Sequence, residues 1–195
     1  MPNTLPNTTT IKELERKFEI AEKKSYANFS FMFGGTNDNL EEIKKLDKNK
    51  VAALKLFLGS STGNMLVDNE KILEDIFKNS NLLIAVHSED EKIIRQNLDS
   101  YIKQYGEDIP VDFHPKIRSE ESCLKSTKKI IELAKRTGAR LHVFHLSTKS
   151  ETKLFNNKIP LDQKRITSEV CVHHLWFCDE DYVDKKSLIK WNPAI

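Results

Sequence analysis

The chain has 195 residues, of which 38% are hydrophobic, so it is long enough to bury a core. Lys and Arg total 31 against 29 for Asp and Glu, and these charges are spread along the chain, which argues against a nucleic-acid partner. No apolar stretch approaches the roughly 20 residues that cross a bilayer, and the first residues lack the apolar segment of a secretory signal. The cysteines form no C-x-x-C pair. We therefore expect a cytoplasmic protein without a membrane partner.

Apolar runs rich in Val, Ile and Phe alternate with amphipathic, charged stretches, which is typical of βα units in a parallel sheet. A helix is predicted over residues 8–24, where threonines precede apolar residues at helical spacing. A later helix is predicted to begin at a Ser119 cap and to end at Gly138. Strands are predicted over residues 27–35, 51–59, 81–88, 139–147 and 165–174. The sequence predicts a single α/β domain over residues 1–195.

Polar side chains interrupt or end several of the predicted strands. Lys55 lies within the second strand, and His87 ends the third. His145 ends the fourth strand, and His173 and His174 end the fifth. A single histidine at a strand end is more often a packing or capping residue. Several on successive strands converge at the C-terminal edge of a (β/α) barrel, so together they predict a metal or catalytic site.

Lys55 is unusual because its strand is apolar on both faces. One interpretation places it at a sheet edge, where the stem lies on apolar surface and the amine reaches water. The apolar flanks instead favour a central strand, where an unpaired ammonium would be costly to bury. Desolvation lowers the pKa of a lysine, and a neutral amine can add carbon dioxide to form a carbamate that bridges two metal ions. This chemistry fits a strand lysine that faces strand-end histidines.

Other polar residues allow further interpretations. A small zinc site could be formed by Cys171, His173, His174 and Cys178. The predicted strand over residues 165–174 argues against this site, because successive side chains of a strand point to opposite faces. We expect the two adjacent histidines to shape the main site instead. His114 is expected to be a structural loop residue, and Arg118 to anchor the same loop or lie at the solvent surface.

Seven segments combine into one pattern along nearly the whole chain: MPNT (1–4), ALKLFLGSSTGNM (53–65), VHSED (86–90), HPKIRSEESC (114–123), LHVFHLST (141–148), SEVCVHHL (168–175) and WNPAI (191–195). Together they resemble the bacterial dihydroorotases of the cyclic amidohydrolase superfamily. The resemblance implies part of a TIM-type (β/α)8 barrel. It also implies a zinc hydrolase that catalyses the reversible cyclisation of N-carbamoyl-L-aspartate to L-dihydroorotate in pyrimidine biosynthesis. Its expected partner is therefore this small-molecule substrate.

The resemblance implies roles for particular residues. Lys55 matches the carboxylated lysine that bridges two zinc ions (Zn²⁺). His87 and His145 match the histidines that complete the second metal. Asn3 and Asn192 match residues that contact the substrate carboxylate and ring. Neutral imidazoles suit zinc, and amides can donate to a carboxylate without adding charge.

Two motifs of the resembling family are not present in this sequence: a His-x-His pair followed by arginine, and an aspartate expected to move the proton. We therefore expect an internal fragment that lacks the first and last barrel strands and is inactive by itself. Two alternatives remain open. One is an allantoinase or hydantoinase of the same superfamily, and the other is a non-catalytic structural partner, for instance of aspartate transcarbamoylase. A homo-oligomer is also left open.

Overall fold

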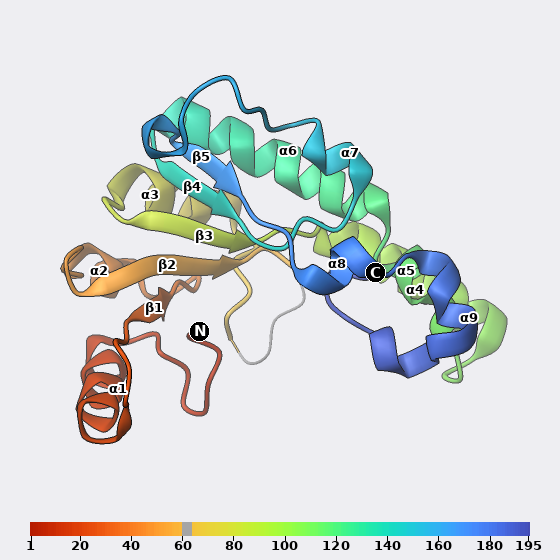
Figure 1. Cartoon of the computed structure of the whole chain (residues 1–195), viewed down its shortest axis with the longest axis horizontal. Helices are drawn as coiled ribbons and strands as arrows, with labels where there is room; N and C mark the ends of the chain where they lie inside the picture. The colour runs from red at the N-terminus through yellow and green to blue at the C-terminus, as the bar shows by residue number, and fades with distance from the viewer. Residues whose placement is uncertain (60–63) are drawn as a thin grey trace. The chain divides into compact units, whose positions relative to one another are not determined.

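A computed structural model describes residues 1–59 and 64–195 (Figure 1). Residues 60–63, part of the motif at 53–65, lie outside the described residues. Five strands form a parallel sheet in the order β1-β2-β3-β4-β5. The strands are β1 (Phe31–Gly34), β2 (Val51–Phe57), β3 (Leu83–His87), β4 (Arg140–Val143) and β5 (Ile166–Ser168). The α-helices are α1 (Ile11–Lys24), α2 (Leu40–Lys44), α3 (Glu70–Asn79), α4 (Glu91–Tyr105), α5 (His114–Ile117), α6 (Glu120–Thr137), α7 (Lys149–Thr152), α8 (Val172–Trp176) and α9 (Tyr182–Lys185). The predicted α/β class with a parallel sheet is confirmed.

The chain divides into two compact units, which are described separately below. The first unit is Met1–His87 with Glu132–His142, and the second is Ser88–Ile131 with Val143–Ile195. The single domain over residues 1–195 stays a prediction. Among the described residues, the helices are too short or too polar to cross a membrane.

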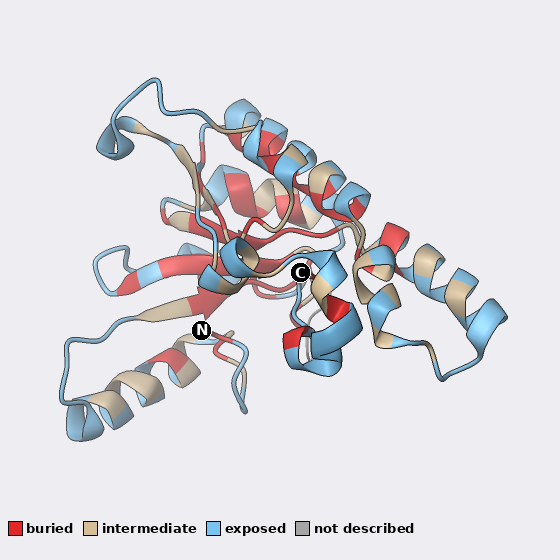
Figure 2. Ribbon diagram, turned by 45° about the vertical axis from the view of Figure 1, so that its right-hand side comes forward, coloured by how far each residue is buried: buried red, intermediate tan, exposed pale blue. Residues whose placement is uncertain are grey.

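Strand β2 is the centre of the first unit, because it pairs with β1 on one side and β3 on the other. Ala53, Lys55 and Phe57 lie on one face of β2, whereas Leu54 and Leu56 lie on the other, and all are buried. Figure 2 shows the buried residues concentrated in the strands and on parts of the helices. A strand that is buried on both faces is typical of a central strand in an α/β sheet. The central position predicted for the strand of Lys55 is confirmed.

Strand β1 ends at a pair of glycines that allow close approach of the neighbouring chain. Gly34 is aligned with Lys55 in the β1–β2 register, and a Cβ atom at Gly34 would lie 3.1 Å from Cβ of Pro2. The backbone N–H of Gly35 donates to the carbonyl of Lys55 at 3.0 Å, and a Cβ atom at Gly35 would lie 2.3 Å from Cδ2 of Leu56. A larger residue at Gly35 would therefore force the side chain of Leu56 to move.

The helices predicted at residues 8–24 and after Ser119 are present. Helix α1 begins after Thr10, whose hydroxyl accepts from the backbone N–H of Glu13 at 3.2 Å. Helix α6 begins after Ser119 and ends before Gly138, whose φ of 72° is a left-handed conformation that glycine adopts without steric cost. Cap chemistry therefore located both helices correctly.

The fourth strand is shorter than predicted. Strand β4 ends at Val143, so the prediction that His145 ends this strand is wrong. His145 has a φ of 38°, which breaks the extended conformation of the chain. The turn at His145 explains why the apolar run continues to Leu146 while the strand does not.

The fifth strand is also shorter than predicted. Strand β5 covers only Ile166–Ser168. Its backbone pairing with the preceding segment ends at Glu169, whose N–H donates to the carbonyl of Val143 and whose carbonyl accepts from the N–H of Leu146. The residues beyond have no continuing ladder because the neighbouring segment has turned away. Val172–Trp176 forms the helix α8, so the prediction that His173 and His174 end a strand is wrong.

Candidate functional site

Lys55 and His87 lie on the same face of two neighbouring strands in the first unit. The parallel register pairs Lys55 with Ala85 and Phe57 with His87. Side chains two residues apart on a strand share a face, so all four side chains point to one side. Lys55 is 1% exposed and His87 is 4% exposed. The structure therefore brings these two predicted site residues together near the C-terminal ends of β2 and β3.

The ring of Phe57 contacts both of these side chains. Nζ of Lys55 lies 4.9 Å from the centroid of the Phe57 ring, and the rings of Phe57 and His87 are 6.1 Å apart. An aromatic face stabilises an ammonium by about 0.5–2 kcal/mol. This contact by itself offsets only part of the cost of burying a charge, which is several kcal/mol. Phe57 is thus one of the groups that stabilise the Lys55 side chain.

The N-terminal segment that carries Asn3 lies close to Lys55. Pro2 packs against Gly34, which is the register partner of Lys55. The pKa of the Met1 amino group is lowered, mainly by burial and further by nearby lysine ammonium groups that include Lys55. Asn3 itself is exposed, so its amide is accessible to a ligand.

His145 lies in the second unit, in the loop after β4. Its φ of 38° is uncommon for a residue with a side chain, and such strained conformations occur often at functional sites. The next residues line an open cavity of about 410 Å³, together with Glu169 and His174. Small-molecule pockets have volumes of about 300–1,000 Å³. The predicted convergence of His145 with the residues of the first unit stays a prediction.

Two histidines of the second unit hold the segment that carries Asn192. Nε2 of His114 lies 2.6 Å from the backbone oxygen of Trp191, and Nε2 of His174 lies 3.3 Å from that of Pro193. A carbonyl oxygen only accepts, so each Nε2 carries the proton and donates. The exposed Asn192 is therefore fixed through the carbonyls on both sides of it.

The protonation of these two histidines follows from their surroundings. Burial lowers the pKa of His114 and, independently, the pKa of His174. The hydrogen bond to a backbone carbonyl raises the pKa in each case, but less than burial lowers it. Both imidazoles are therefore neutral at pH 7, with the remaining lone pair on Nδ1.

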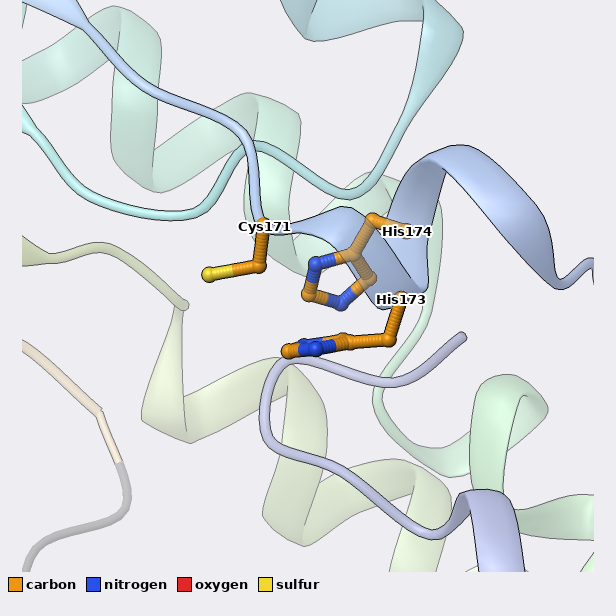
Figure 3. A group of neighbouring side chains, drawn as sticks. All are labelled: Cys171, His173 and His174. Carbon is orange, nitrogen blue, oxygen red and sulfur yellow. The ribbon is translucent and has the colours of Figure 1, made fainter.

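Cys171, His173 and His174 lie side by side, as Figure 3 shows. One sulfur or nitrogen atom from each residue lies within 4.8 Å of the others. The expectation that these side chains point apart is wrong, because His173 and His174 belong to the helix α8 rather than to a strand. The exposed Cys178 is not a member of this group.

A buried ion pair in the second unit was not found by the reasoning from sequence. Nη2 of Arg118 donates to Oε2 of Glu89, and the side chains are 7% and 0% exposed. Arg118 therefore does not lie at the solvent surface, and its anchoring role is the correct alternative. The signal in the sequence was the acidic Glu89, which follows the end of strand β3 by two residues.

Glu151 is a second buried carboxylate that the sequence did not reveal. It is 2% exposed and accepts hydrogen bonds from the hydroxyls of Thr127 at 2.7 Å and Thr148 at 2.8 Å. Burial raises the pKa of the Glu151 carboxyl, and these hydroxyls reduce that effect. These hydrogen bonds hold the loop between His145 and α7 in place.

Comparisons with known proteins agree with this fold. No family model matches the chain. A dihydroorotase of Methanosarcina acetivorans is 31% identical over 206 residues, which cover 100% of this chain and 42% of that protein. An allantoinase of Bacillus velezensis is 30% identical over 197 residues, which cover 99% of this chain and 43% of that protein. The L-hydantoinase structure from Arthrobacter aurescens matches with a TM-score of 0.79 and 23% identity, over 93% of this chain and 41% of that one.

Along its whole length the chain is thus similar to enzymes of the cyclic amidohydrolase class. Within that class it is a relative of the dihydroorotases, which recur among the similar proteins and align with the whole chain. The chain spans less than half the length of these curated relatives. The predicted resemblance is confirmed at this level.

Proposed function

We propose that this chain carries part of the active site of a dihydroorotase, which interconverts N-carbamoyl-L-aspartate and L-dihydroorotate in pyrimidine biosynthesis. The similarity to dihydroorotases along the whole chain supports this reaction. The structural observation that carries the proposal is the buried Lys55 amine beside His87 in the centre of a parallel sheet.

Lys55 would act as a metal ligand after reaction with carbon dioxide. In its neutral form, Nζ attacks the carbon of carbon dioxide: a C–N bond forms as one C=O π bond breaks, and the nitrogen gives a proton to water, which leaves an anionic carbamate. Burial favours the neutral amine that this reaction requires. The product has two oxygens and a negative charge, which suit a pair of divalent cations.

The residues fit a zinc centre in donor type, and Lys55 and His87 are also buried. The carbamate of Lys55 and the imidazoles of His87 and His145 would hold the zinc. When bound, zinc supplies polarisation of a carbonyl and stabilisation of the negative charge that develops on it. The buried β2–β3 face excludes water from Lys55 and His87, which strengthens electrostatic interactions there.

Asn3 and Asn192 would bind the substrate. Each is exposed, and each amide can donate to a carboxylate or ring oxygen without bringing a charge. Asn192 is positioned by the hydrogen bonds of His114 and His174 to its two neighbours. A fixed backbone reduces the entropy that is lost when Asn192 binds a ligand.

Carbon-13 NMR after equilibration with labelled bicarbonate and zinc tests the role of Lys55. We expect a carbamate signal in the wild-type chain that is lost in Lys55→Ala and retained in Lys50→Ala, the matched change at an exposed lysine just before β2. Zinc retained after gel filtration should fall in the same variant. A Lys55→Ala chain that keeps both the signal and the zinc would contradict the proposal.

Allantoinase is the second candidate, because an allantoinase also aligns with 99% of the chain at 30% identity. Binding of L-dihydroorotate, allantoin and hydantoin to the zinc-loaded chain separates the candidates within the class. Preference for dihydroorotate, with loss in Asn192→Ala, supports the first candidate. Preference for allantoin supports the second, and binding of none of the three favours a non-catalytic role.

A further inference from the structure

The residues Cys171, His173 and His174, which the proposed reaction does not require, contain the donor atoms of a second kind of metal site. Their sulfur and nitrogen atoms lie within 4.8 Å of one another, on or beside one short helix. Thiolate and imidazole are the preferred ligands of zinc. We propose that Cys171, His173 and His174 bind a zinc-type divalent cation, with a fourth position left for water or another ligand.

The geometry needs only a small adjustment to close around a cation. Zn–N bonds of about 2.0–2.1 Å and Zn–S bonds of about 2.3 Å place tetrahedral ligand atoms about 3.3–3.6 Å apart. The present limit of 4.8 Å exceeds this by about 1 Å or slightly more. Figure 3 shows the Cys171 side chain beside the two imidazole rings with its sulfur pointing to one side, so a rotation about its Cα–Cβ bond would bring the sulfur closer to the ring nitrogens.

The hydrogen bond of His174 prepares it as a ligand. Its Nε2 donates to the carbonyl of Pro193, which leaves the lone pair of the neutral ring on Nδ1. Nδ1 is shielded from solvent, and it has no hydrogen-bond partner among the residues that the structure describes. Histidines that bind metals commonly donate their other N–H to a backbone carbonyl, because this bond fixes the tautomer and the ring orientation.

The contact of His173 is compatible with the same role. Its ring stacks on Trp191 with centroids 4.4 Å apart and an interplanar angle of 12°. Stacking uses the face of the imidazole, whereas a metal binds the lone pair in the plane of the ring. A cation at this site would therefore join Cys171 and α8 to the segment of Trp191 and Pro193 that also carries Asn192.

Cobalt(II) is a suitable probe because a thiolate ligand gives an intense charge-transfer band in the near ultraviolet. Lys55, His87 and His145 contain no thiol, so cobalt bound by them does not produce this band. We expect the band in the reduced wild-type chain and its loss in Cys171→Ser. It should remain in the matched control Cys178→Ser, which changes an exposed thiol outside the cluster.

A second variant protects the test against a folding defect. His173→Gln keeps a polar side chain on α8, and we expect weaker cobalt binding with an unchanged circular dichroism spectrum. A folded wild-type chain without the band at saturating cobalt would overturn the proposal. A band that persists in folded Cys171→Ser, or that is lost in Cys178→Ser instead, would also overturn it. Failure of Lys55→Ala to lose zinc would bear only on the proposed function.

Discussion

Replacing Lys55 by methionine separates the effect of the buried lysine on stability from its proposed role in binding zinc. Lys55 is 1% exposed in the central strand β2, and methionine has a similar shape without the charge. Replacement of a buried ion pair by well-packed apolar residues of similar volume is often neutral or stabilises a protein by about 1–4 kcal/mol, because the cost of desolvating the charges is removed. Loss of the contact with Phe57, 4.9 Å from Nζ, removes about 0.5–2 kcal/mol of stabilisation. We therefore expect the free energy of unfolding of metal-free Lys55→Met to stay close to that of the wild type or to rise, by up to about 3 kcal/mol.

Urea unfolding of the metal-free chain, in buffer depleted of carbon dioxide, measures this difference. Lys50→Met is the matched control, since Lys50 is exposed and its replacement should change stability by less than about 0.5 kcal/mol. The same Lys55→Met chain should retain less zinc than the wild type. A Lys55→Met chain that is less stable than the wild type by more than about 1 kcal/mol would refute the reasoning. Lys55 would then be a net structural contributor.

Three further predictions concern the second unit. Arg118→Met should lower the free energy of unfolding in urea by about 3–5 kcal/mol, because it leaves the buried Glu89 carboxylate without its ion-pair partner. Adding Glu89→Leu should recover most of that loss. Equal stability of the single and double variants would contradict this prediction. Burial raises the pKa of Glu151, so the stability that this group contributes is present below the unfolded pKa and is lost as the pH rises through the folded value. Glu151→Gln should therefore gain stability relative to the wild type as the pH rises from acid to neutral, and a constant difference in urea midpoint would refute it. Burial lowers the pKa of His114, so its contribution is present above the unfolded pKa and is lost as the pH falls through the folded value. Acidification should then change the fluorescence of Trp191 in the wild type and less so in His114→Ala, and identical pH profiles would argue against this contact.

Much of the fold was predictable because it depends on local chemistry. The helix caps at Thr10 and Ser119 and the left-handed Gly138 placed two helices correctly. The apolar flanks of Lys55 identified a central strand, since burial on both faces leaves its mark on consecutive residues.

The errors arose where distant residues decide the local conformation. The β-branched residues around Val172 favour a strand, but strand pairing ends at Glu169 because the neighbouring chain turns at His145. The same limit hid the pair of Glu89 and Arg118, which are far apart in the sequence. Residue types indicated that cysteines and histidines near Val172 could form a metal cluster, but only the folded chain shows which side chains meet.

The hydrogen bonds of the histidines restrict how each one can bind a metal. His114 and His174 each use Nε2 as a donor to a backbone carbonyl, so either could bind a cation only through Nδ1 unless the segment around Asn192 were released. His174 lies beside Cys171 and His173, so two further possible metal ligands are close to it. His114 belongs to no such group of three or more metal-binding side chains among the described residues. The same imidazole can therefore position Asn192 through one nitrogen and bind a cation through the other. Metal binding at this cluster should in consequence make the segment around Asn192 more rigid, not displace it.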